Sequence, residues 1–373
     1  MKVISIVGAR PQFIKSAPVS AALRAAGHAE LLIHTGQHYD HNMSQVFFDE
    51  MGISKPYRNL GIGSGSHGWQ TGQMLMQLEN VLEQERPDWV VVYGDTNSTL
   101  AAALAAVKIN LHVAHVEAGL RSFNRAMPEE HNRILTDHCA TLLCCPTQTA
   151  MTNLAYEGIG QRAHLVGDTM YDAVLRYAVT ARRHSTMMAT YELAPKAYCL
   201  ATLHRPYNTD VSQHLRDIFA AFGDIRDLIV LPIHPRTRHA LAASQVPIPD
   251  NVRLIDPVGY LDMLMLEENA RLILTDSGGI QKEAYLLAVP CVTLRPETEW
   301  VETVEAGWNV VVGADRGQIV STVNDHRWPQ GAPPTVFGDG HASEKIVDLL
   351  AGCNQLTLRS QANRLQFAQG REG

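Results

Sequence analysis

The chain has 373 residues, of which 46% are hydrophobic and 18% charged, and this composition is typical of a soluble globular protein of two domains. The formal net charge of −7 gives no electrostatic reason to expect nucleic acid or an anionic membrane surface as a partner. No apolar run reaches the roughly 18 residues needed to span a bilayer, and the N-terminal run is too short for a signal peptide, so we expect no membrane partner and a cytoplasmic location.

Short apolar runs alternate with helix-like patterns along most of the chain. The first predicted strands, with helical patterns between them, are residues 3–7, 30–34, 89–93, 112–116 and 142–145. After a more polar stretch around residues 182–195, the second set comprises 199–202, 229–231, 253–255, 272–274, 291–294 and 310–312. Fully apolar strands separated by helices predict parallel sheets that are covered on both faces.

These elements predict an α/β protein of two doubly wound, Rossmann-like domains. We place the N-terminal domain at residues 1–170 and the C-terminal domain at 171–350. The polar segment 351–373 either packs back on the N-terminal domain as a helix or frays. Ligands of such sheets bind beyond the carboxyl ends of the strands, so the loops after each apolar run are the candidate sites.

The segment Asp276-Ser277-Gly278-Gly279 follows one predicted strand and precedes a helical pattern. Two glycines allow a sharp turn and a close approach of the backbone to a ligand, and the N-terminus of the next helix attracts anions. Glu283 follows one helical turn later, where it can accept hydrogen bonds from sugar hydroxyls. The pattern indicates a phosphate site, although an ordinary strand–turn–helix corner has the same sequence features.

Charged side chains follow several other predicted strands. Arg10 follows the first strand and suits a diphosphate, but a surface arginine is an equally good interpretation. Asp95 is either a functional carboxylate or a helix cap, and Glu117 follows the next strand. Glu129 and Glu130 begin a helix, and compensation of the helix dipole accounts for one of the two.

In the predicted C-terminal domain, the strand at residues 199–202 leads to His204 and Arg205. A histidine at this position is a candidate acid, base or phosphate ligand. Together these residues predict a cleft with Asp95, Glu117 and Glu129 on one edge, and with His204 and the Ser277 segment on the other.

Several other kinds of site lack support in the sequence. No Gly-x-Gly-x-x-Gly fingerprint follows a predicted strand, so a nicotinamide cofactor is not expected. The six cysteines show no C-x-x-C spacing, and no histidine, cysteine and aspartate cluster has metal-ligand spacing. We therefore expect no structural disulfide and no metal.

Taken together, the motifs resemble those of the non-hydrolysing UDP-N-acetylglucosamine 2-epimerases over roughly residues 1–315. The matching segments, in family order, are Gly8-Ala9-Arg10-Pro11-Gln12-Phe13-Ile14-Lys15, Gly94-Asp95-Thr96, Val116-Glu117-Ala118-Gly119-Leu120-Arg121, Pro128-Glu129-Glu130, His204-Arg205, Asp276-Ser277-Gly278-Gly279-Ile280-Gln281 with Glu283, and Leu294-Arg295.

The resemblance implies a fold of the glycosyltransferase-B type, a UDP-sugar bound between the two domains, a homodimer and no organic cofactor. It implies that UDP-N-acetylglucosamine and UDP-N-acetylmannosamine interconvert by elimination of UDP to a 2-acetamidoglucal, followed by re-addition. The implied catalytic residues are Asp95, Glu117, Glu129 and, in addition to its diphosphate contact, His204. The implied substrate-binding residues are Arg10, Lys15, His204, Arg205, Ser277, Gly278, Gly279, Glu283 as the ribose ligand, and Arg295.

The chain departs from the best-known members in two segments. Residues 37–41 read Gln-His-Tyr-Asp-His in place of Gln-His-Arg-Glu-Met, a region that known members use for a second, activating UDP-sugar, so this regulation is in doubt. Residues 298–302 read Thr-Glu-Trp-Val-Glu in place of Thr-Glu-Arg-Pro-Glu, which resembles a subgroup acting on UDP-2,3-diacetamido-2,3-dideoxyglucuronic acid. Arg236 or Arg238 could pair with the carboxylate of that substrate.

Functions of other classes also remain open from the sequence. A glycosyltransferase of the same fold would bind the UDP-sugar but would need an acceptor groove, and carboxylates after three separate elements suit proton transfer better. A nucleotide-sugar sensor would bind the ligand without exchanging the C2 hydrogen. A hydrolysing epimerase would release free UDP.

Overall fold

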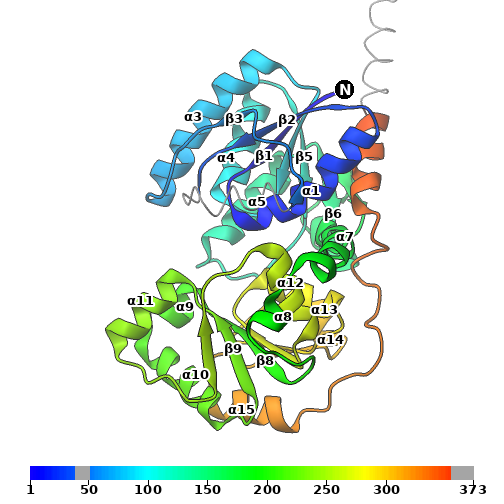
Figure 1. Ribbon diagram of the computed structural model, residues 1–373. Coiled ribbons are helices and arrows are strands. Elements are labelled where there is room, and N and C mark those ends of the chain that lie inside the picture. The colour runs from blue at the N-terminus through cyan, green and yellow to red at the C-terminus, as the bar shows by residue number, and fades with distance from the viewer. Residues whose placement is uncertain (38–50, 354–373) are drawn as a thin grey trace, which may run out of the picture. The chain divides into compact units, whose positions relative to one another are not determined.

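The computed structural model describes residues 1–37 and 51–353 and divides the chain into two compact units (Figure 1). Unit 1 contains residues Met1–Ala173 together with the chain from Val336 onward, and unit 2 contains Val174–Thr335. Residues 38–41 of the departing segment and residues 354–373 of the C-terminal segment lie outside the described residues.

Unit 1 is built on a seven-stranded sheet in which every strand pair is parallel. The spatial order is β3 (Arg58–Asn59), β2 (Ala29–His34), β1 (Lys2–Val7), β4 (Trp89–Tyr93), β5 (His112–Val116), β6 (Leu142–Cys145) and β7 (Ala163–Leu165). The order reverses between β1 and β4, and the loops that follow these two strands therefore flank a topological switch point.

Four helices of unit 1 begin at a proline or at a capping side chain. Thr96 accepts a hydrogen bond from the Thr99 amide, and Thr147 accepts one from the Ala150 amide. The unit contains α1 (Arg10–Ala25), α3 (His67–Glu85), α4 (Asn97–Lys108), α5 (Pro128–Cys139), α6 (Gln148–Tyr156), the 3-10 turn η1 (Gly160–Arg162) and the first turn of α7 (Thr169–His184). Helices α3 and α4 lie side by side (Figure 1).

The chain that returns to unit 1 forms a helix over residues 342–353. Its first turn is capped by Asp172, whose carboxylate accepts hydrogen bonds from the Ala342 and Ser343 amides at 3.1 and 2.7 Å. Ile346 and Leu350 of this helix are fully buried. The segment is therefore an integral part of the core of unit 1.

Unit 2 contains a second, six-stranded parallel sheet. Its order is β10 (Val252–Ile255), β9 (Leu228–Pro232), β8 (Tyr198–Thr202), β11 (Leu272–Thr275), β12 (Cys291–Thr293) and β13 (Asn309–Val311). Its helices are α8 (Met187–Thr190), α9 (Pro206–Thr209), α10 (Ser212–Asp224), α11 (Pro235–Ser244), α12 (Tyr260–Asn269), α13 (Gly278–Leu286), α14 (Val301–Glu305) and α15 (Arg316–Asp325). Here the strand order reverses between β8 and β11.

Two hydrophobic clusters in unit 2 account for the continuous apolar strands. One cluster contains Leu274 with Phe219 and Phe222 of α10, and the other contains Ile273 with Leu266 of α12. Alternate residues of β11 thus contribute to different clusters, and both are buried. The predicted fold of two doubly wound α/β domains is confirmed, and in the described residues no helix is long and apolar enough to cross a membrane.

Candidate functional site

Unit 1 places Glu117 directly after β5, next to a buried lysine. The backbone of Glu117 has a φ of +70°, a left-handed conformation that is uncommon for a residue with a side chain. Its amide and that of Ala118 both donate to the Cys144 carbonyl at 3.1 Å, which holds this turn against β6. The Glu117 carboxylate forms an ion pair with Lys15 of α1, and the two side chains are only 6% and 11% exposed.

Asp95 follows β4 and is held by an arginine. Both Nε and Nη2 of Arg133 donate to Oδ2 of Asp95, at 3.0 and 2.7 Å, and Nη1 of Arg133 donates to Glu130 at 2.8 Å. The carboxylate of Asp95 remains 31% exposed, whereas Arg133 is buried. Arg133 therefore fixes the direction of the Asp95 side chain and leaves part of it accessible.

The two acids at the start of α5 have different surroundings. Glu130 is buried and accepts hydrogen bonds from the amides of Ser122 and Phe123 at 2.9 and 3.0 Å. Burial alone would raise the pKa of Glu130, but the Ser122 hydrogen bonds and the Arg133 charge outweigh it and lower the pKa. Glu129 is half-buried and so has the access to solvent that Glu130 lacks.

A buried network connects the loops that carry Asp95 and Glu117. Oδ1 of Asp137 lies 2.7 Å from Nδ1 of His115, and Nε2 of the same ring lies 2.7 Å from the Gly94 carbonyl oxygen. Oδ2 of Asp137 accepts hydrogen bonds from the Gly119 amide at 3.1 Å and from Nη1 of Arg121 at 2.8 Å. One carboxylate therefore fixes the backbone of both loops.

The loop after β1 is held by Gln12. Its side-chain oxygen accepts from the amides of Gly8 and Ala9 at 2.7 and 3.0 Å, and its nitrogen donates to the Tyr93 carbonyl at 2.8 Å. A Cβ at Gly8 would lie 2.2 Å from hydroxyl oxygens of two neighbouring side chains, so only glycine fits there. Arg10, half-buried, begins α1 at the end of this loop.

In unit 2, the loops after β8 and β11 meet at Asp276. This carboxylate is fully buried and accepts hydrogen bonds from the amides of His204 and Arg205. Oδ1 of Asp276 also lies 3.2 Å from Nδ1 of His204, whose side chain is 38% exposed. Burial alone would raise the pKa of Asp276, but the His204 ring and the donated hydrogen bonds outweigh it and hold the pKa below its usual range.

Asp276 and Ser277 connect β11 to α13, and Gly278 and Gly279 are the first two residues of that helix. Ser277 is the N-cap residue, and its side chain makes no capping hydrogen bond. A Cβ at Gly278 would lie 2.5 Å from Oε1 of Glu299, which explains the glycine at this position. Nη2 of Arg295 lies 3.2 Å from Oε2 of Glu299, and both side chains are more than nine-tenths buried.

Glu283 is buried on α13, one turn after the glycines. Burial raises the pKa of Tyr260 well above its ordinary value, and the negative charge of Glu283 adds to this shift. The carboxylate thus lies against the phenol of the first residue of α12. Arg205 is half-buried next to His204.

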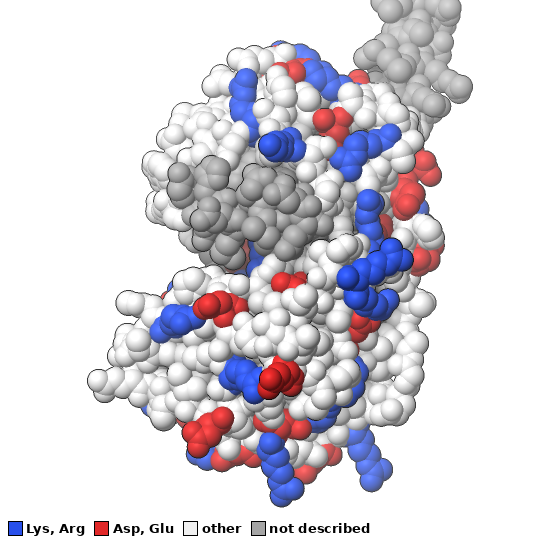
Figure 2. Space-filling model, viewed as in Figure 1, with Lys and Arg blue, Asp and Glu red and all other residues white. Residues whose placement is uncertain are grey.

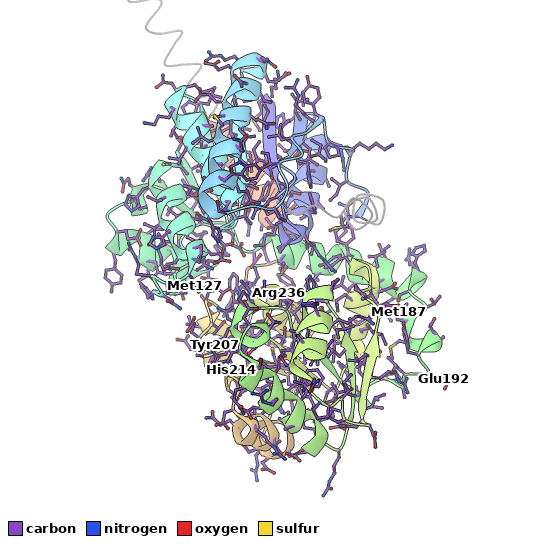
Figure 3. All side chains as sticks on the ribbon, turned by 90° about the vertical axis from the view of Figure 1, so that its left-hand side faces the viewer. Met127, Met187, Glu192, Tyr207, His214 and Arg236 are labelled. Atoms are coloured by element: carbon purple, nitrogen blue, oxygen red, sulfur yellow. The ribbon has the colours of Figure 1, made fainter. Side chains whose placement is uncertain are left out.

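The two arginines considered for a uronic carboxylate are both paired within unit 2. Nη2 of Arg236 donates to both oxygens of Asp210 at 2.9 and 2.7 Å, and Nη2 of Arg238 lies 2.9 Å from Asp256. Arg236 is the second residue of α11, and Figure 3 labels it together with Tyr207 and His214 of the same unit. Basic and acidic side chains are interspersed on the face shown in Figure 2.

The described residues contain no group of three or more histidine, cysteine or acidic side chains that could hold a metal.

Comparison with known proteins decides the family. The family described as UDP-N-acetylglucosamine 2-epimerase matches residues 21–351. The chain belongs to this family. A Methanococcus maripaludis UDP-N-acetylglucosamine 2-epimerase homolog is 51% identical over 94% of this chain and 99% of its own length. The UDP-2,3-diacetamido-2,3-dideoxy-D-glucuronate 2-epimerase of Pseudomonas aeruginosa is 46% identical, over 94% of this chain and 99% of its own.

Solved structures of the UDP-N-acetylglucosamine 2-epimerase family agree with this assignment. The Methanocaldococcus jannaschii enzyme, solved with UDP-N-acetylglucosamine and UDP, matches with a TM-score of 0.89 and 45% identity over 94% of this chain and 99% of its own. The Neisseria meningitidis enzyme bound to UDP-N-acetylglucosamine matches with a TM-score of 0.85 and 31% identity, over 94% of this chain and 100% of its own. The glycosyltransferase VinC matches with a TM-score of 0.51 and 16% identity. This likeness concerns the fold alone, and it agrees with a fold of the glycosyltransferase-B type.

Sequence reasoning missed several residues that hold these loops. Arg133, Asp137 and Asp276 are buried and charged. Arg133 and Asp137 were not named as candidates, and Asp276 was named only as part of the motif around Ser277, with no role of its own. A usable signal was present for Arg133, because it lies three residues after Glu130, the spacing of a helical ion pair. Asp137 follows one turn later on α5 and pairs with residues on another element, which no local spacing indicates.

Proposed function

We propose that this chain is a non-hydrolysing epimerase that interconverts UDP-N-acetylglucosamine and UDP-N-acetylmannosamine. The proposal assigns proton transfer to unit 1 and recognition of the diphosphate mainly to unit 2. The observation that carries it is the pair of carboxylates after adjacent strands β4 and β5, Asp95 and Glu117, in a chain of this family. Each carboxylate has a cationic partner from another element.

The reaction proceeds in two balanced steps. A carboxylate removes the C2 proton, the C2 electron pair forms the C1–C2 double bond of 2-acetamidoglucal, and the C1–O bond breaks to release UDP. A second acid then protonates C2 from the other face while a UDP oxygen attacks C1. Such a route needs an acid and a base on opposite faces, and we assign these roles to Asp95, Glu117 and Glu129.

The contacts of Glu117 and Asp95 support these roles. The Lys15 ammonium lies against the Glu117 carboxylate inside the fold and compensates its charge. We therefore assign two roles to Lys15, which pairs with Glu117 and also attracts the negatively charged substrate. Arg133 holds one oxygen of Asp95 and leaves the side chain partly exposed, as proton exchange with solvent requires.

The diphosphate is assigned to the amides at the start of α13, at Ser277, Gly278 and Gly279. His204, Arg205, Arg295 and, from unit 1, Arg10 supply positive or hydrogen-bonding groups. Glu283 is assigned to the ribose hydroxyls, for which a buried carboxylate on the same helix is suitable. We also propose that the protein is a homodimer in the cytoplasm. Light scattering of the purified protein measures whether it is a dimer.

UDP-2,3-diacetamido-2,3-dideoxyglucuronic acid is the second candidate substrate. Its support is the 46% identity to the Pseudomonas aeruginosa enzyme, against 44% to the Methanocaldococcus jannaschii UDP-N-acetylglucosamine 2-epimerase. Whichever of Arg236 and Arg238 binds its carboxylate would have to leave an exposed ion pair. Exposed pairs contribute only about 0–1 kcal/mol, so this rearrangement costs little.

Proton NMR in heavy water with each UDP-sugar in turn tests the proposal. We expect a C2 epimer that carries deuterium at C2, because the acid and base exchange with solvent between elimination and re-addition. Full retention of hydrogen in the epimer would contradict elimination. Binding of the UDP-sugar without exchange of its C2 hydrogen would indicate a sensor. Accumulation of free UDP would indicate a hydrolysing enzyme, and turnover only with an added acceptor would indicate a glycosyltransferase.

A further inference from the structure

Asp276 connects the His204 loop to the start of α13 within unit 2. Strands β8 and β11 are neighbours in the sheet, with Thr202 opposite Thr275 in the register. Asp276 follows β11 immediately, and His204 follows β8 after one residue. The two side chains therefore belong to adjacent loops at the carboxyl edge of the sheet, at the point where the strand order reverses.

The two carboxylate oxygens of Asp276 have different sets of donors. Oδ2 accepts from the amides of His204 and Arg205 at 3.1 and 3.0 Å and from Nδ2 of Asn208 at 3.0 Å. Oδ1 faces the His204 amide at 3.1 Å and Nδ1 of the His204 ring at 3.2 Å. The backbone of the loop is thus fixed mainly by Oδ2, whereas the ring interacts with Oδ1.

This arrangement determines which ring nitrogen of His204 carries hydrogen. An ionised carboxylate can only accept hydrogen bonds, so Nδ1 must donate to Asp276. Among the described residues no hydrogen bond engages Nε2, and the side chain is 38% exposed. Nε2 is therefore the ring atom that is available to a ligand. The His234 ring lies near it, with 6.1 Å between the two ring centroids, and Arg205 is the next residue along the chain.

We propose that Asp276 is the positioning residue for His204, and that it holds the ring with hydrogen on Nδ1 so that Nε2 faces the UDP-sugar. Nε2 then accepts a hydrogen bond or a proton when the ring is neutral, and donates to the diphosphate when the ring is protonated. The proposal rests on the assignment of His204 to the substrate site. Because Asp276 directly precedes Ser277, the same residue sets the position of the ring relative to the amides at the start of α13.

Asp276→Asn separates this role from a purely structural one. The amide oxygen can take the place of Oδ2 and keep its three donors, and the amide nitrogen then faces Nδ1 of His204. An NH₂ group donates, so Nδ1 must become the acceptor and the hydrogen moves to Nε2. The variant should thus retain the loop and invert the tautomer. An aspartate that only held the loop would leave the tautomer and the turnover nearly unchanged.

The experiment uses the full-length protein labelled with 15N-histidine. In the wild type we expect His204 to show a protonated Nδ1, with its signals assigned by their loss in His204→Asn, and in Asp276→Asn a protonated Nε2. Turnover of Asp276→Asn should fall about 10²- to 10⁴-fold, the range seen when general acid–base catalysis or the correct tautomer is lost. Affinity for UDP measured by calorimetry should change much less than turnover.

Asp172→Asn is the matched control, since Asp172 is also a buried aspartate, and it accepts hydrogen bonds from two backbone amides, those of Ala342 and Ser343. Its tautomer spectrum and turnover should match the wild type. A wild-type His204 without hydrogen on Nδ1 overturns the inference even if Asp276→Asn does not fold. Normal turnover in Asp276→Asn together with lost turnover in His204→Asn also overturns it. Normal turnover in His204→Asn instead refutes the assignment of His204, while deuterium incorporation at C2 would still support the epimerase.

Discussion

Replacement of Asp137 by asparagine tests the buried network of unit 1. The carboxylate has no exposed surface, and its two oxygens together accept hydrogen bonds from Nδ1 of His115, Nη1 of Arg121 and the Gly119 amide. An amide has one oxygen for these donors and no negative charge to compensate Arg121. Glu157 would then remain as the partner of that guanidinium, through contacts of 2.7 Å to Nε and Nη2.

The expected loss is a substantial fraction of the stability of a typical domain. Removal of one member of a buried ion pair costs about 3–5 kcal/mol, and the whole domain is stable by about 5–15 kcal/mol. The matched control is Asp227→Asn in unit 2, because Asp227 is paired with Arg271 and the two side chains are 30% and 34% exposed. For this half-exposed pair we expect a loss of about 1 kcal/mol or less.

Hydrogen exchange measured by mass spectrometry in increasing urea distinguishes the two units. In Asp137→Asn the amides of β5 and α5 should lose protection at lower urea concentration than in the wild type, while those of β8 and β11 should change little. The reasoning would be refuted if the loss in unit 1 were below about 1 kcal/mol, the range for an exposed pair. Equal losses in both units would show that the effect is not local.

The pH dependence of this loss follows from the pKa of Asp137. Burial alone would raise that pKa, but His115 and Arg121 outweigh it and lower the pKa in the folded state. A group with a depressed folded pKa contributes stability above its unfolded pKa of about 3.9, and loses it as the pH falls through the folded value. The difference between wild type and Asp137→Asn should therefore shrink in acid, as the pH falls below about 4 and through the folded pKa of Asp137.

Three further substitutions test other parts of the site. Gly119→Ala should destabilise unit 1 in urea unfolding, because Gly119 has a φ of +82° and a Cβ there would lie 2.5 Å from the Ala150 carbonyl oxygen; unchanged stability would contradict the geometry. Glu117→Gln should lower turnover by about 10² or more with UDP affinity retained, and near-normal turnover would remove it from proton transfer. Ser277→Ala should weaken UDP binding by roughly 0.5–1.5 kcal/mol in calorimetry if its hydroxyl contacts the diphosphate, whereas unchanged affinity would place the diphosphate elsewhere.

The sequence predicted the parts of the fold that depend on local patterns. Strands β4 and β11 are almost wholly apolar, and β1 and β5 are largely apolar and buried, because both faces of each sheet are covered. The two-residue strand β3 was missed because both of its residues are exposed, so no apolar run marks it. Strand β7 was missed for a similar reason, since two of its three residues are exposed.

The candidate site was predictable only in its outline. Residues directly after strands, such as Asp95, Glu117 and Ser277, could be found because strand ends meet at one edge of a parallel sheet. The cationic partners could not be found in this way. Lys15 reaches Glu117 from α1 across 102 positions of sequence, and Arg133 reaches Asp95 across 38. Such pairs depend on the packing of separate helices, which the spacing of residues along the chain does not encode.

The discontinuity of unit 1 has a consequence for the order of events during biosynthesis. Unit 2 is contiguous, whereas unit 1 needs the helix at residues 342–353, whose amides bind Asp172. About 160 residues separate the two parts of unit 1, which corresponds to about 10–30 s of translation at typical rates. During that interval the surface that receives Ile346 and Leu350 has no partner from its own chain. The N-terminal half of the protein is thus the last to complete its core, although the ribosome makes most of it first.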